Sequence, residues 1–155
     1  MPASYGAAMV RGVDGEDLEP AWRVRVLDTR VARLATVGGG GRPHVVPFCF
    51  AFSGRAIVSA VDDKPKRTLD LARLRNIRAD PRVEVVFDHY EDDWRRVWWV
   101  RVRGAARLLE EGPEREAALD RLVERYEQYR LNRPRGAVLS IDPEQWTAWS
   151  GDEGL

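Results

Sequence analysis

The stretch "VARLATVGGGGRPHVVPFCFAFSGRAIVSAV", residues 31–61, alternates apolar runs with short segments of turn residues. Runs of this kind, rich in Val, Ala and Phe, are typical of β-strands. The interruptions "GGGGRP" and "SG" are typical of hairpin turns, because glycine adopts the backbone angles that tight turns need. The stretch therefore predicts consecutive antiparallel strands over 31–37, 44–52 and 55–61.

The flanking sequence adds helices and further strands. Residues 82–90 alternate apolar with polar side chains, as a strand with one buried face does, and Pro113 opens a segment with helical apolar spacing. Residues 1–15 are expected to form a flexible N-terminal tail, and 16–155 a single domain. The complete pattern predicts helices over 17–30, 67–81 and 112–129, and strands over 82–90, 97–110, 136–141 and 146–150.

This order of elements predicts the fold class. Most of the strands follow one another through short turns, so the sheet should be mainly antiparallel. We expect a mainly β protein with helices (α+β), built as a six- to seven-stranded antiparallel barrel. Gly104, inside the long strand 97–110, predicts a bulge or a close approach of two backbones.

Composition excludes several classes of function. The chain has 155 residues, a formal net charge of zero and a pI near 6.8, so no overall field favours nucleic acid or an anionic membrane. A lone cysteine, Cys49, excludes an internal disulfide. The sequence has no apolar run long enough to span a bilayer and no signal-peptide pattern, so a cytoplasmic location is the default expectation.

Lys64 and Lys66 are the only lysines of the chain, and both fall in "VDDKPKRT", residues 61–68. The segment joins a predicted strand to a predicted helix, whose N-terminus offers free N–H groups and a positive dipole end. With Arg67, the lysines could cradle a phosphate or a carboxylate. The alternative is a solvated turn in which the two preceding aspartates neutralise the lysines. No glycine-rich nucleotide-binding motif is present.

Motifs for catalysis by side chains are scarce. His44 and His89 fall on different predicted strands, without a cysteine or a carboxylate at metal-ligand spacing. Ser59 and Ser140 lack the setting of a nucleophilic serine. His44 could face a pocket, but no nucleophile with its base is visible. A bound cofactor is therefore expected to supply the chemistry, with no catalytic side chain and no metal.

Tryptophan is unusually frequent, with six in the chain. Trp98 and Trp99 are adjacent on a predicted strand and must point to opposite faces. One of them can fill the barrel, and the other then needs a cover, either a subunit interface or a planar ligand. Packing in the core or at an interface is the alternative explanation for most of the six.

Several of these pieces occur together, in the same order, in a known family. They are "ARLATV", then "RPHVVP" on the first hairpin, the third strand running into a basic loop, "NIRADPRV", and "VRVRGAARLL" on the long strand. In this order, over roughly residues 30–110, the sequence resembles the pyridoxamine 5'-phosphate oxidase-like split-barrel proteins of the FMN-binding type. It is most similar to their deazaflavin-dependent branch, which uses coenzyme F420.

The resemblance implies a homodimer of split barrels with two cofactor sites between the subunits. The cofactor ring would contact the second and third strands, and the basic loop would hold the phosphate. Arg73, three residues before Asn76, stands where many relatives have a lysine and competes with Lys64 and Lys66 for that role. The candidate cofactor contacts are His44, Pro47, Phe48, Ser59, Ala60, Val61, Lys64, Lys66, Arg67, Arg73, Asn76, Trp98 and Arg101, the last two reaching the site from the partner subunit.

The implied activity is hydride transfer between a reduced deazaflavin and a conjugated small-molecule acceptor. The rivals are an FMN-dependent oxidase or reductase, a non-enzymatic flavin or deazaflavin carrier, and a purely structural dimer. Neither nucleic acid nor a membrane is an expected partner.

Overall fold

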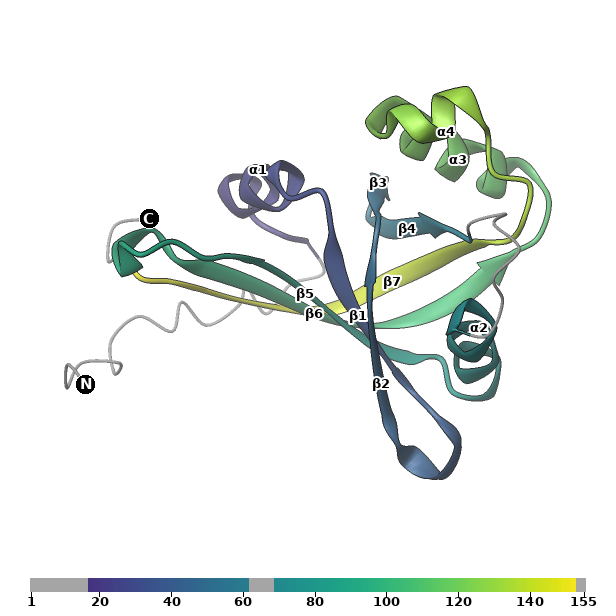
Figure 1. The fold of residues 1–155 in the computed structure, drawn as a ribbon, viewed down its shortest axis with the longest axis horizontal. Helices are drawn as coiled ribbons and strands as arrows, with labels where there is room; N and C mark the ends of the chain where they lie inside the picture. Colours follow the sequence, from purple (N-terminus) through teal and green to yellow (C-terminus); the bar gives the residue numbers. More distant parts are fainter. Residues whose placement is uncertain (1–16, 62–68, 153–155) are drawn as a thin grey trace.

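The computed structural model describes residues 17–61 and 69–152, which form one twisted antiparallel sheet with helices around it (Figure 1). The strands lie in the order β2-β1-β5-β6-β7-β4-β3, which confirms the predicted fold class. The predicted tail lies outside the described residues. The strands are β1 (Ala32–Val37), β2 (Pro43–Phe48), β3 (Ala51–Ser53), β4 (Ala56–Ala60), β5 (Arg82–His89), β6 (Trp98–Leu109) and β7 (Val138–Ser150); the helices are α1 (Pro20–Asp28), α2 (Leu69–Ala79), α3 (Pro113–Arg125) and α4 (Glu127–Leu131).

The barrel closes at a corner between β2 and β3. These two strands lie at opposite ends of the strand order, yet only Cys49 and Phe50 separate them in the chain. The predicted single strand over 44–52 is therefore wrong: β2 pairs with β1, and β3 pairs with β4. The corner was hidden because every second side chain, at Phe48, Phe50 and Phe52, stays buried through it.

The last strand corrects a second prediction. Residues 136–141 and 146–150 were expected to be separate strands, but β7 runs without a break from Val138 to Ser150 beside β6. The expected turn is a bulge, where the register with β6 shifts between Arg103 and Gly104. Pro143, which has no N–H to donate, lies opposite Gly104 at this irregularity. The expected bulge at Gly104 is confirmed.

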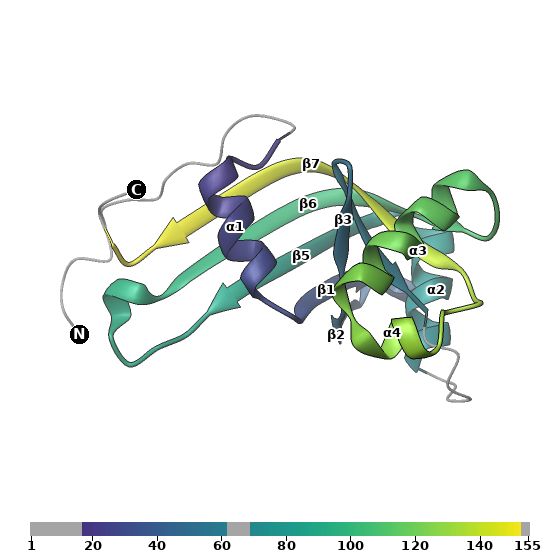
Figure 2. The same ribbon diagram turned by 90° about the horizontal axis from the view of Figure 1, so that it is seen from above.

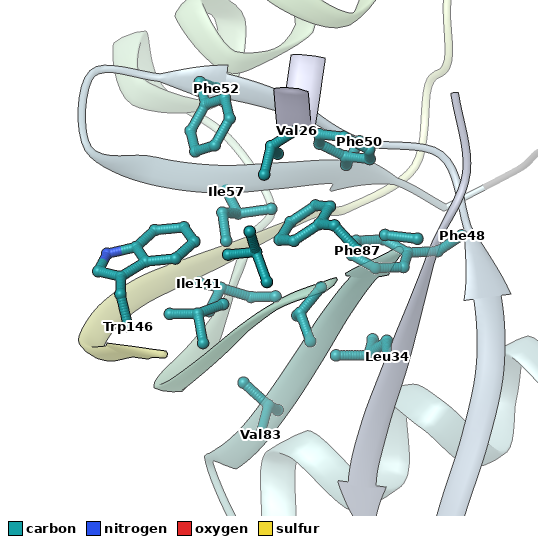
Figure 3. Close-up of a cluster of buried hydrophobic side chains, with 14 of the residues drawn as sticks. Val26, Leu34, Phe48, Phe50, Phe52, Ile57, Val83, Phe87, Ile141 and Trp146 are labelled. Carbon is teal, nitrogen blue, oxygen red and sulfur yellow. The ribbon is translucent and has the colours of Figure 1, made fainter. Parts of the chain in front are cut away.

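Large side chains fill the interior of the barrel (Figure 3). Phe50 and Phe87 are fully buried, and their rings meet edge to face with centroids 4.8 Å apart. Trp146 stacks near Phe87, and Trp22 and Val26 of α1 join the same cluster. A planar cofactor therefore has to bind outside the barrel.

The helices cover the barrel in different places (Figure 2). α1 begins at Pro20 rather than at Asp17, whose carboxylate instead forms an ion pair with Arg55 at 2.9 Å. The predicted helix over 112–129 is interrupted at Tyr126 and continues as α4. None of the helices in residues 17–61 and 69–152 is both long enough and apolar enough to cross a bilayer.

Tyr126 holds the corner between β2 and β3 in place. Its hydroxyl accepts the N–H of Phe50 at 3.0 Å and can donate to the carbonyl of Arg30 at 2.7 Å or of Phe50 at 2.9 Å. The break between α3 and α4 therefore fastens the helical layer to the barrel where the barrel closes.

Candidate functional site

Three of the predicted site residues gather between the β1–β2 hairpin and α2. His44 lies opposite Thr36 in the pairing of β2 with β1, and Asn76 of α2 donates its Nδ2 hydrogen to Thr36 Oγ1 at 3.0 Å. Arg73, one helical turn before Asn76, is 5% exposed. Nδ1 of His44 is buried and has no hydrogen-bond partner in the described part of the chain. The fold thus builds a polar cluster of His44, Thr36 and Asn76, with the buried Arg73 one turn earlier on α2.

A buried ring nitrogen without a partner is costly, so it indicates a partner beyond the described residues, either a bound group or another part of the chain. Thr36 lies in the matching piece "ARLATV", but nothing in that piece marks it as a site residue. Only the strand register places it beside His44.

The predicted ring contacts on β4 lie along a backbone edge that has no ladder partner on one side. Pairing with β7 continues to Ala60 and is extended by the Val61 N–H, which donates to the carbonyl of Ala137 at 3.2 Å. Pairing with β3 ends at Val58. On that side the backbone of residues 59–61 has no ladder partner among the described strands. Ser59 and Ala60 are 3% and 5% exposed as whole residues, so this unpaired edge is buried within the single chain up to Val61, which is half-buried.

The other predicted ring contacts lie on β2, which is an edge strand of the described sheet. Pro47 is exposed on the outer face, and Phe48 points into the core with 5% exposure. The two predicted segments, Pro47–Phe48 and Ser59–Val61, thus both lie on strand edges. Edges of this kind offer N–H and C=O groups to a flat polar ring.

The prediction for the long strand needs a correction. Trp98 fills one end of the barrel, with 8% exposure, and its ring stacks on His89 with centroids 6.3 Å apart. Arg101 lies on the opposite, outer face of β6, where its Nε is 3.7 Å from the Glu84 carboxylate. Within one chain, Trp98 and Arg101 therefore face opposite sides of β6, and their contact with a cofactor from the partner subunit stays a prediction. Trp99 is the tryptophan that shares the outer face with Arg101.

The outer face of the sheet is only partly covered. Val45 is 62% exposed and lies beside Ala35, while Trp99 lies beside Trp149 across β6 and β7. The two tryptophans are half-buried within the single chain. This half-covered apolar surface fits the expected need for a partner or a planar ligand.

The predicted phosphate-binding residues are placed only in part. Lys64, Lys66 and Arg67 lie outside the described residues, and their role remains a prediction. The segments on either side of them are Val61, just after β4, and α2, which contributes Asn76 to the polar cluster and carries Arg73 one turn earlier.

The acid at the end of α2 belongs to a charge pair, and its pKa is lowered rather than raised. The Asp80 carboxylate accepts hydrogen bonds from the side chain and the backbone of Arg82, which lower its pKa to about 2. This pair fixes the turn from α2 into β5 on the exposed surface. It offers no proton at neutral pH and gives the site no general acid.

Proteins of known structure share the whole architecture. A conserved hypothetical protein of Mycobacterium tuberculosis superposes with a TM-score of 0.68 at 19% identity, over 88% of each chain. An FAD-binding protein of Mesorhizobium loti gives 0.62 at 24%, over 84% of this chain and 94% of its own. A heme-binding protein of Mycobacterium smegmatis gives 0.67 at 23%, over 90% of this chain and 57% of its own. At these identities the likeness shows the fold alone.

Sequence comparison identifies the family. Among curated proteins, none matches this sequence. The family profile described as pyridoxamine 5'-phosphate oxidase matches residues 18–150, which includes every described strand and helix. Because this match covers most of the sequence, the chain belongs to the pyridoxamine 5'-phosphate oxidase family.

Proposed function

We propose that this protein is an oxidoreductase that uses coenzyme F420 and reduces a conjugated small-molecule acceptor. The observation that carries the proposal is the unpaired backbone edge of Ser59–Val61, which leads directly into the segment with the only two lysines of the sequence. That arrangement suits a ring with polar edges joined to a phosphodiester. The subfamily resemblance of the sequence favours the deazaflavin over FMN.

The described residues fit such a cofactor. The filled barrel leaves the strand edges as the place for the ring, held by the backbone of residues 47–48 and 59–61. The buried Nδ1 of His44 can bond to a cofactor oxygen, and Arg73 and the lysines can hold the phosphodiester. When bound, the reduced deazaflavin supplies a hydride. The chain positions the acceptor and keeps water from one face, and solvent supplies the proton.

Two rivals follow from the shared fold. The FAD-binding protein of Mesorhizobium loti supports a flavin as the alternative cofactor, with FMN the form expected from the sequence. The heme-binding protein of Mycobacterium smegmatis supports binding without catalysis. Equilibrium titration with F420 and with FMN separates the cofactors, and tighter binding of FMN overturns the proposal. Oxidation of reduced F420 by a panel of quinones separates an enzyme from a carrier.

Replacing both lysines tests the proposed phosphate contact. Lys64→Ala with Lys66→Ala should weaken F420 binding by about 1–3 kcal/mol, because charge-assisted hydrogen bonds are lost. The dissociation constant is measured by fluorescence titration. Arg78→Ala is the matched control, because this cation of α2 pairs with Glu110 at 3.5 Å on the surface. Equal affinity of the double variant and the wild type would leave the segment as a solvated turn.

We also propose that two copies associate through the outer face of the sheet. Trp99→Ala should then weaken the dimer by about 2–4 kcal/mol, as expected for a central aromatic residue of an interface. Trp98→Ala should instead lower the stability of the subunit, because that ring is buried in the barrel. Sedimentation equilibrium measures the association constant, with Trp94→Ala, in the exposed β5–β6 hairpin, as control. Unchanged association of the Trp99 variant would place the interface elsewhere.

A further inference from the structure

A groove of about 400 Å³ lies between α1, β3 and α3. Its walls carry four arginines, Arg23 and Arg30 from the α1 side and Arg121 and Arg125 from α3. Glu124 is the one acidic residue in its lining. In Figure 1, α1 and α3 lie beside β3 at the top of the view, and α2, which contributes to the candidate cofactor site, lies below them. The groove is therefore a separate feature.

Three of the four arginines in this groove are held without a carboxylate, as Arg25 and Arg130 also are elsewhere on the described surface. The described chain otherwise tends to pair arginine with carboxylate, as in the ion pair of Arg33 with Asp88 at 2.7 Å. Inside the groove, Arg121 pairs with Glu124 at 3.1 Å, which uses the one carboxylate in the lining. The remaining three guanidinium groups, those of Arg23, Arg30 and Arg125, form no ion pair with the carboxylates of residues 17–61 and 69–152.

Neutral groups hold two of these cations in place. Arg23 donates to the carbonyl of Gly54 at 3.3 Å, and its guanidinium lies 4.2 Å from the ring centroid of Phe52. Arg30 donates to the carbonyl of Arg125 at 2.8 Å. Such contacts fix the direction of a guanidinium and leave its charge uncompensated.

The third cation is fixed in the same way. Arg125 donates to the carbonyl of Thr29 and, at 3.3 Å, to the hydroxyl of Tyr126, and its guanidinium lies 4.8 Å from the ring centroid of Phe50. It is therefore anchored to the rigid corner of the barrel. Three fixed cations that converge on one hollow attract an oxyanion strongly, because little side-chain entropy is lost when it binds.

We infer that this groove binds a small organic molecule with a doubly charged oxyanion, such as a phosphate monoester, next to a small apolar group. Three cations without a carboxylate partner among the described residues favour two negative charges over one. Leu27, which is 38% exposed in the lining, offers a contact for the apolar part. A volume of about 400 Å³ suits a small molecule rather than a protein segment.

Phenyl phosphate is a suitable probe, with benzoate and phenol as the singly charged and uncharged comparisons. In calorimetric titration of the full chain, phenyl phosphate should bind more tightly than benzoate, and phenol should not bind. Arg23→Gln should weaken phenyl phosphate binding by about tenfold or more, through the loss of charge-assisted hydrogen bonds. Arg23→Lys should retain part of the affinity. Thermal unfolding of each variant checks that the fold is kept, and Arg30→Gln provides a second, independent test.

Two controls separate this site from the proposed cofactor site and from general ionic attraction. Lys64→Ala with Lys66→Ala should leave phenyl phosphate binding unchanged, and Arg23→Gln should leave F420 binding unchanged. The paired surface cation Arg78 provides the second control, as Arg78→Gln, which should have no effect. The inference is overturned if phenyl phosphate does not bind, if Arg23→Gln binds it like the wild type, or if the lysine variant or Arg78→Gln loses it equally. Weaker F420 binding by Arg23→Gln would assign the groove to the cofactor instead.

Discussion

Replacing Phe50 with alanine should lower the free energy of unfolding by about 3–5 kcal/mol. Phe50 is fully buried at the corner where the barrel closes, with the ring of Phe87 against it at 4.8 Å. Truncation removes apolar contacts and leaves a cavity. The strands on both sides are held by their pairing and cannot move in to fill it. Urea unfolding at fixed protein concentration, followed by tryptophan fluorescence, measures the change.

Two comparison variants make this result specific. Val24→Ala truncates an α1 side chain that is 62% exposed, and should change the free energy of unfolding by no more than about 0.5 kcal/mol. Tyr126→Phe removes the hydroxyl that holds the Phe50 backbone and should cost about 1–3 kcal/mol, because a buried N–H loses its acceptor. If Phe50→Ala lowered the free energy of unfolding by less than Tyr126→Phe does, the corner would depend on the hydrogen bond of Tyr126 to the Phe50 backbone rather than on the buried ring.

The corner also shows where reading the sequence succeeds and where it fails. Alternating burial was predictable, since Phe48, Phe50 and Phe52 repeat every second residue as a strand requires. The change of hydrogen-bond partner between Phe48 and Ala51 was not, because partner choice leaves no mark on the periodicity of one strand. Fold class therefore followed from the pattern, whereas the place where the barrel closes required coordinates.

The residues of the candidate site also fall into those that the sequence indicated and those that only the structure brings together. Lysines 64 and 66 stood out by composition, and the resemblance assigned the strand segments around Pro47 and Ser59. The link from Asn76 to Thr36, next to His44, depends on strand register and on the position of α2. The arginine groove is even harder to predict from the sequence, because its cations come from α1 and α3, which are far apart in the chain. Contacts of such long range have no local signature.

Replacing Gly104 with valine should lower the free energy of unfolding by about 3 kcal/mol or more, and Gly104→Ala by about 1–3 kcal/mol. A Cβ atom at this position would lie 2.4 Å from the carbonyl oxygen of Asp142 and 3.0 Å from Cγ2 of Ile141. Neither neighbour can retreat freely, since both belong to β7, which pairs with β6 along its whole length. The same urea unfolding experiment measures both variants.

Gly39→Ala is the matched control for this prediction. A Cβ at Gly39 would meet no atom within 4 Å, so alanine there should be neutral or slightly stabilising, because it restricts the unfolded chain. The contrast isolates the close approach from the general effect of removing a glycine. Equal stabilities of Gly104→Ala and Gly39→Ala would mean that β7 shifts to admit the methyl group. The bulge beside Pro143 would then be a flexible joint in the longest pairing of the sheet rather than a fixed one.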